Sequence, residues 1–148
     1  MLPLDGTEPL DDDEFLYRRI PVSQNWYDPT SDSRPSPEAF RPTQFDNTGL
    51  SLSRGKYKSI EDAARGMEGK KYYIAILRAG DLRAMGIPVE PSPQPDDPGH
   101  AEIPGLTYAD RKTDRALEWK VLLAQQLCLR VEGPFASEGK IASEKSNS

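Results

Sequence analysis

Two proline-rich stretches limit the regular structure of this chain to short segments. Eight of its 14 prolines fall in residues 28–42 and 91–99. Both stretches are rich in turn-forming residues and lack periodic apolar residues, which predicts long surface loops. Because proline cannot donate to a β-ladder, strands are expected only outside these loops.

The segments between the loops carry the patterns of strands and helices in an irregular order. Ser59 predicts the N-cap of a first helix that closes at Gly66 or Gly69, and Thr107 predicts the start of a longer helix. Since regular βαβ alternation is absent, we expect one small α+β domain with a largely antiparallel sheet and two main helices. Strands are predicted over residues 15–20, 49–53, 72–77, 100–103 and 127–131, a short helix over 81–86, and the long helix over 107–126.

Composition separates a body from two flexible ends. Residues 1–14 carry many carboxylates and few apolar side chains, which predicts an acidic flexible arm. Residues 15–134 are predicted to form the α+β domain. Residues 135–148 have the composition of a disordered tail.

Charge and cysteine content narrow the classes of partner. The net charge of -5 makes nucleic acid an unlikely partner. The basic run at residues 54–58 is the one place where RNA or phosphate binding remains open. Cys128 is the only cysteine, which excludes an internal disulfide and a zinc site of four thiolates and predicts a small buried side chain. No signal peptide and no membrane span are predicted, so we expect a cytoplasmic protein.

His100 is the only histidine and has Glu102 two residues later. A single imidazole is able to act as a general base, and it is equally able to brace its loop through hydrogen bonds. A metal site built from Asp96, Asp97, His100 and Glu102 is disfavoured, because the prolines oppose folding these side chains round one point. We therefore predict no metal.

Three separated places carry residues suited to chemistry on a dinucleotide. Arg18 or Arg19 lies on the first strand, Ser51 and Ser53 lie on the second, and Glu102 lies on a later short strand. In this order they resemble the arginine, serine-x-serine and glutamate elements of ADP-ribosyltransferase-like folds. The resemblance implies that the arginine and serines hold NAD, and that Glu102 steadies the oxocarbenium-like transition state as nicotinamide leaves.

In that resemblance, His100 stands where many arginine-modifying members carry an additional glutamate, which makes it the second candidate catalytic residue. The transferase hypothesis requires all of these side chains to converge on one cleft. Residues 15–134 also look similar to short bacterial proteins of unassigned function, which implies a bacterial origin.

Two functions therefore stand as hypotheses. The leading one is a non-catalytic protein-interaction or accessory module of the bacterial cytoplasm, with no cofactor and an unknown protein partner. Its contact surface is expected to include the aromatic residues Trp26, Tyr27 and Phe40, since proline-stiffened loops lose little entropy on binding. The alternative is an ADP-ribosyltransferase-like enzyme, or a degenerate relative, that binds NAD.

Overall fold

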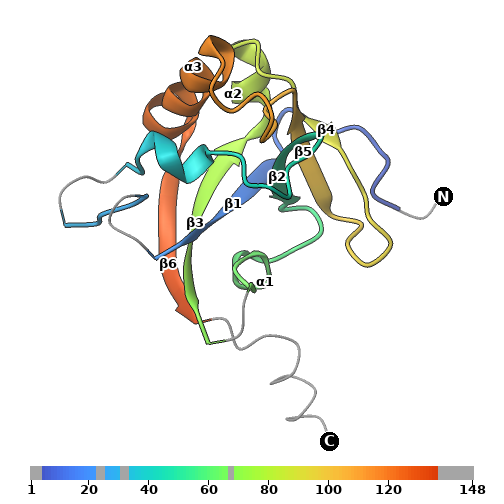
Figure 1. Cartoon of the computed structure of the whole chain (residues 1–148). Helices are drawn as coiled ribbons and strands as arrows, with labels where there is room; N and C mark the ends of the chain where they lie inside the picture. Colours follow the sequence, from blue (N-terminus) through green and yellow to red (C-terminus); the bar gives the residue numbers. More distant parts are fainter. Residues whose placement is uncertain (1–4, 23–25, 31–33, 67–68, 137–148) are drawn as a thin grey trace, which may run out of the picture.

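The computed structural model describes residues 5–22, 26–30, 34–66 and 69–136. Its centre is a six-stranded antiparallel sheet with the strand order β4-β5-β2-β1-β3-β6 (Figure 1). This confirms the predicted α+β class and antiparallel sheet. The strands are β1 (Phe15–Pro21), β2 (Gly49–Arg54), β3 (Lys71–Arg78), β4 (Glu90–Pro91), β5 (His100–Pro104) and β6 (Arg130–Ala136).

Short helices cover parts of the sheet. In Figure 1, α2 and α3 lie together at one end of the molecule, and α1 lies apart from them at the other. Within the described ranges, no helix has the length and apolar character needed to cross a membrane. The helical segments are η1 (Pro37–Phe40, a 3₁₀ turn), α1 (Ile60–Ala63), α2 (Ala79–Ala84), α3 (Asp114–Leu122) and η2 (Leu123–Leu127, a π-helix).

The two faces of the sheet contribute to separate apolar clusters. Alternate side chains of a strand point to opposite faces, so Leu16 and Ile20 of β1 enter the larger cluster while Tyr17 packs against the smaller one. The larger cluster includes buried residues of η1, α2, α3 and η2. The smaller cluster joins α1 to Tyr72 and Ile74 of β3. The face of the sheet that carries the larger cluster therefore forms the main core. The other face is only partly covered, by α1.

The helices begin or end at other residues than the sequence predicts. Asp62 N donates to Ser59 Oγ at 3.1 Å, which confirms the predicted N-cap, but α1 is only one turn long. Thr107 caps a local turn, and α3 begins only after Thr113, whose Oγ1 accepts from Ala116 N at 3.2 Å. Threonine side chains close turns as readily as helices, which is why the prediction placed the start of α3 too early.

The last strand is longer than predicted and starts later. Leu127 and Cys128 belong to the end of η2, and β6 continues through Gly133 and Pro134 to Ala136. Pro134 lies on an edge strand, where its missing N–H need not join a ladder. The domain therefore extends at least two residues beyond the predicted boundary at residue 134. Residues 137–148 of the predicted tail lie outside the described residues.

Two single-residue predictions have opposite outcomes. Cys128 is buried, as predicted, and burial raises the pKa of its thiol to about 11. Phe40 is completely buried in the main core, while Trp26 and Tyr27 are partly buried against it. The predicted contact surface of these aromatic residues is therefore wrong for Phe40, because η1 turns its side chain inward.

Residues 5–14 lie against the body and do not form the predicted flexible arm; residues 1–4 are outside the described residues. We call residues 5–14 the strap. Arg54, with no exposed surface, donates from Nε and Nη2 to the two carboxylate oxygens of Glu14 at 2.6 and 2.9 Å. Its Nη1 donates to the carbonyl oxygens of Gly6 and Glu8, and Leu10 of the strap is buried in the main core. The strap's carboxylates thus neutralise a cation inside the protein.

Replacing Arg54 with methionine is expected to lower the free energy of unfolding by about 3–5 kcal/mol, because Glu14 keeps a buried charge without its partner. The matched control is Arg83→Met, since Arg83 holds Asp12 of the same strap by an exposed ion pair, where losses stay within about 0.5 kcal/mol. Urea denaturation measures both. The double variant Arg54→Met with Glu14→Leu should recover most of the loss, and equal losses in the two single variants would contradict the assignment.

Glu8 makes the strap sensitive to acid. The hydrogen bond from the Tyr57 hydroxyl, helped by Lys56, lowers the pKa of Glu8 from its ordinary value of 4.5 to about 2. A carboxyl group with a lowered pKa stabilises the fold above its unfolded-state pKa, and that contribution is lost as pH falls towards the folded-state pKa. The stability difference between wild type and Glu8→Gln should therefore shrink between pH 4.5 and about 2.

Urea midpoints over that pH range test this dependence. The control is Glu90→Gln, since Glu90 is exposed and forms no ion pair with the described part of the chain. A Glu8→Gln difference that stays constant with pH would show that this carboxylate does not hold the strap.

Candidate functional site

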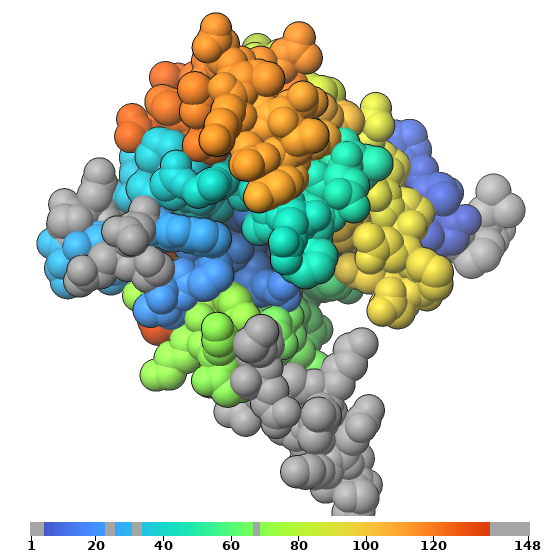
Figure 2. Space-filling view, viewed as in Figure 1, coloured from blue at the N-terminus to red at the C-terminus, as the bar shows by residue number. Residues whose placement is uncertain are grey.

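A pocket of about 510 Å³ gathers all of the predicted site residues except Glu102. Figure 2 shows the face on which it opens: the loop before β2 (teal), β1 (blue), the segment around α1 (green) and the loop after β4 (yellow) surround a recess. The predicted residues that line it are Arg18, Arg19, Ser51, Ser53 and His100.

The serines of β2 make the hollow. Leu50 and Leu52 are buried in the main core, so the alternating Ser51 and Ser53 face the opposite side of the sheet. Ser53 lies between Tyr17 of β1 and His100 of β5 in the register. A small side chain between two large ones leaves a depression in the sheet surface.

Strands β1 and β2 separate beside this hollow. They pair only at Leu16 with Arg54 and at Tyr17 with Ser53. Farther along, Ser51 N donates to Asp46 Oδ1 at 3.2 Å and Ser51 O accepts from Arg18 Nη1 at 3.2 Å. Side chains therefore take the hydrogen bonds that a neighbouring strand would otherwise make.

Arg18 has a structural role at this separation of β1 and β2, which we call the sheet joint. Its side chain lies on the core side, and its guanidinium donates to the carbonyl oxygens of Ala39 at 3.0 Å and of Arg41 and Ser51 at 3.2 Å. Burial lowers the pKa of Arg18 to about 10, and the nearby charge of Asp46 opposes that shift. Three of its five N–H donors bind backbone carbonyl groups and the side chain is buried, so Arg18 is poorly placed to hold a diphosphate.

Arg19 has the opposite environment. It follows Arg18 in β1, so it points to the other face of the sheet, where it is exposed. Its Nη1 donates to Arg65 O, and the guanidinium carbon lies 5.2 Å from the ring centre of Tyr72. Among the described residues no carboxylate forms an ion pair with Arg19. Its guanidinium is therefore held at the pocket surface by a backbone carbonyl and an aromatic ring.

Asp97 and His100 line another part of the pocket wall. Lys58 Nζ lies 3.0 Å from Asp97 Oδ2, while Asp97 Oδ1 is buried without a hydrogen-bond partner in the described structure. His100 Nδ1 lies 3.0 Å from the carbonyl oxygen of Ser92. In the neutral ring Nδ1 must donate this bond, so Nε2 is left as an acceptor.

Glu102 lies outside the pocket, although it is opposite Ser51 in the register. Its Oε1 accepts from Thr48 Oγ1 at 2.9 Å and from Ser92 Oγ at 3.0 Å. Ser51 Oγ likewise donates to Asp46 Oδ1 at 2.8 Å. The side chains that the transferase hypothesis needs in one cleft are therefore divided between the pocket, the sheet joint and a separate network at the sheet edge.

Phe45 is one residue of the pocket that the sequence analysis did not identify. Its side chain is 81% exposed at the pocket, whereas the neighbouring Asp46 is only 3% exposed. Thr43 N donates to Asp46 Oδ2 at 2.7 Å, and Asp46 N donates to Thr43 O at 2.8 Å. The Thr-x-x-Asp spacing is a signal for such a turn, but it does not show which way Phe45 points.

The basic run at residues 54–58 is neutralised. Arg54 is buried against Glu14, Lys56 Nζ lies 3.2 Å from Glu8 Oε2, and Lys58 pairs with Asp97. These contacts give no support to RNA or phosphate binding by this run. Within the described part of the chain, no three metal-ligating side chains are grouped to share a metal ion.

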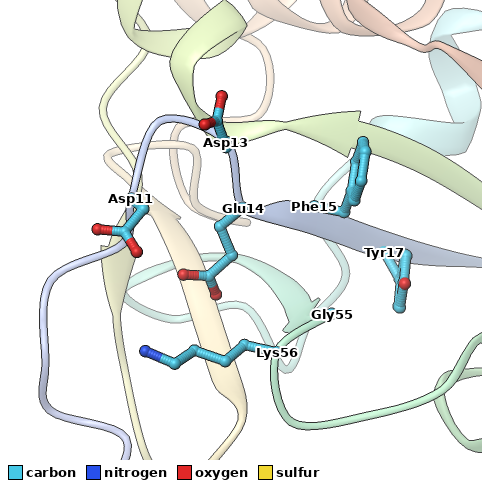
Figure 3. A pocket seen from close by; sticks show the side chains of 7 residues that line it. All are labelled: Asp11, Asp13, Glu14, Phe15, Tyr17, Gly55 and Lys56. Carbon is cyan, nitrogen blue, oxygen red and sulfur yellow. The ribbon is translucent and has the colours of Figure 1, made fainter.

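A second pocket of about 400 Å³ lies beside the strap (Figure 3). Two carboxylates of the strap line this pocket, those of Asp11 and Glu14. Lys56, in the turn after β2, also lines it. Glu14 is paired with Arg54, and Lys56 is paired with Glu8. The charged groups of this pocket therefore hold the strap against the body of the protein. It carries no separate set of reactive groups.

The sequence matches no protein-family model, and comparison with curated proteins and with solved structures finds no match. The resemblance to ADP-ribosyltransferase-like folds and the bacterial origin therefore stay predictions. The assignment of function depends on the pocket alone.

Proposed function

We propose that this protein is a non-catalytic interaction module that docks an extended segment of a partner protein in the pocket beside Phe45. The observation that carries the proposal is the exposure of Phe45 at the pocket rim. Aromatic side chains dominate binding energy at protein interfaces. A solvent-exposed phenylalanine next to a concave polar surface is therefore best suited to contact a partner.

The turn that carries Phe45 is fixed before binding. Asp46 accepts hydrogen bonds from Thr43 and from Ser51, which ties the turn to β2. An anchor held in place by its own fold loses little conformational entropy when it is covered. Complete burial of a phenylalanine contributes about 1.5–3 kcal/mol.

The polar groups of the site favour binding over catalysis. Arg18, Ser51 and Glu102 already use their polar atoms in hydrogen bonds within the protein. A catalytic group must be free to contact its substrate. Arg19, which is exposed at the pocket and has no ion pair among the described residues, is suited to charge pairing with a ligand.

Selection from a random peptide display library tests the proposal. We expect peptides selected on the wild-type protein to bind Phe45→Ala about thirtyfold more weakly, which corresponds to about 2 kcal/mol. Leu117→Ala is the matched control, because Leu117 is exposed on α3 and does not line the pocket. Failure to select any peptide, or equal losses in both variants, would argue against docking at this pocket.

The NAD-binding alternative retains one supporting observation, since Arg19, Ser53 and His100 all line the pocket. Incubation with NAD, followed by measurement of released nicotinamide, distinguishes the two functions. We expect no release from the wild type or from Glu102→Gln, because the Glu102 carboxylate is held outside the pocket by Thr48 and Ser92. Release by the wild type that disappears in the variant would overturn the interaction-module proposal.

A further inference from the structure

We propose that the docked segment continues from the Phe45 pocket along the open face of β1, over Tyr17 to Phe15, and places a lysine or arginine side chain beside Phe15. This inference rests on the proposed function, because it specifies the length of the segment and one of its side chains. Its support is that one face of a single strand lines both pockets.

Alternate residues define the open face of β1. Leu16, Arg18 and Ile20 are buried on the core side, so the residues before, between and after them point to the opposite face. Those four are exposed or half-buried: Phe15, Tyr17, Arg19 and Pro21. An antiparallel sheet is able to leave one face in contact with solvent. Here the central strand β1 does so along its whole length.

Tyr17 belongs to both pockets. In the smaller pocket it lies beside Phe15 (Figure 3). In the larger pocket it lies with Arg19 and Pro21. A Cβ at Gly55 would lie 2.9 Å from the Tyr17 hydroxyl oxygen, so the missing side chain lets the Tyr17 ring rest on the turn after β2. A segment that leaves the larger pocket along β1 therefore meets Tyr17 and then Phe15.

The strand sets the length of the segment. β1 has seven residues, and at about 3.3 Å per residue it spans about 20 Å. An extended segment that follows β1 from the larger pocket to Phe15 therefore needs about seven residues, with alternate side chains turned towards the sheet.

Phe15 provides a second aromatic contact. Its side chain is 43% exposed, and it lines the smaller pocket. Single exposed apolar side chains are common on protein surfaces. Phe15 differs because its pocket shares Tyr17 with the pocket of Phe45. A segment that covers both phenylalanines removes more apolar surface from water than one confined to the larger pocket.

Carboxylates at the smaller pocket favour a basic residue at this end of the segment. Asp11 and Asp13 line the pocket and are exposed, and the Asp13 side chain is 91% exposed even within its ion pair. Lys56, the cation of the lining, is paired with Glu8 at 3.2 Å. A lysine or arginine is able to lay its methylene stem on Phe15 and keep its charged head in water beside the carboxylates.

Peptides from the display selection on the wild-type protein test the inference. A library with about twelve random residues exceeds the roughly seven that follow β1. Selected peptides are synthesised in capped, labelled form, and fluorescence anisotropy measures their affinities. We expect Phe15→Ala to weaken binding about fivefold, which corresponds to about 1 kcal/mol. Met85→Ala is the matched control and should leave affinity unchanged, because Met85 is 44% exposed and lines neither pocket.

Shortened peptides locate the contact. Residues are removed one at a time from each end of a selected peptide. At one end, their loss should abolish the effect of Phe15→Ala and preserve the effect of Phe45→Ala. That end should carry a lysine or arginine.

Exchange of this basic residue for glutamine tests the charge contact. It should weaken binding to the wild type about threefold, as expected for an exposed ion pair. It should have no effect on binding to the double variant Asp11→Asn with Asp13→Asn. The control for net charge is Glu90→Gln with Glu118→Gln, two exposed residues that line neither pocket, and it should keep the threefold effect.

Failure of the inference differs from failure of the proposed function. If Phe45→Ala weakens the selected peptides and Phe15→Ala does not, the path along β1 is wrong while docking beside Phe45 stands. An acidic or neutral residue at the identified end contradicts the basic contact. The exposed Asp11 and Asp13 keep the test decisive even if Phe15→Ala fails to fold. If no peptide is selected, the proposed function and the inference both fail.

Discussion

The ion pair of Arg54 with Glu14 fixes the arrangement on which the rest of the structure depends. Arg54 ends β2 and lies opposite Leu16 of β1, at one of the two positions where those strands pair. Its guanidinium is completely buried, so it remains charged only because Glu14 and the carbonyl groups of the strap surround it. The pairing of the two central strands and the docking of the strap are consequently one interaction.

A second buried arginine has the opposite effect on the same strands. Where Arg54 holds β1 and β2 together, Arg18 and Asp46 fill the space where they separate. The pocket opens at this separation, and its shape depends on polar groups that are already satisfied. Arg19 and Phe45 are among the exposed residues of the pocket that are available for contact with another molecule.

Local patterns predicted most of the sheet, and five residues named from the sequence line the pocket, but the patterns did not show which of their polar atoms are already engaged. Alternation in residues 49–53 identified β2. The same alternation along β1 places the neighbouring residues Arg18 and Arg19 on opposite faces of the sheet. The strap was missed because six carboxylates in a short stretch indicate solvation, and the cation that holds Glu14 lies 40 residues away in the sequence. Phe40 and Phe45 occur in similar polar loops, yet one is buried and the other exposed, since tertiary contacts decide their orientation.

The hydrogen bonds of Arg18 also join the binding surface to the core. One side chain on β1 reaches Ala39 and Arg41, just before the turn that carries Phe45, and Ser51 on β2. Local opening is favoured where buried contacts are few, so we expect a segment tied to a central strand in this way to open together with the sheet. The contact loop therefore behaves as part of the protein's cooperative folding unit, so that a partner meets a surface with the rigidity of the sheet itself.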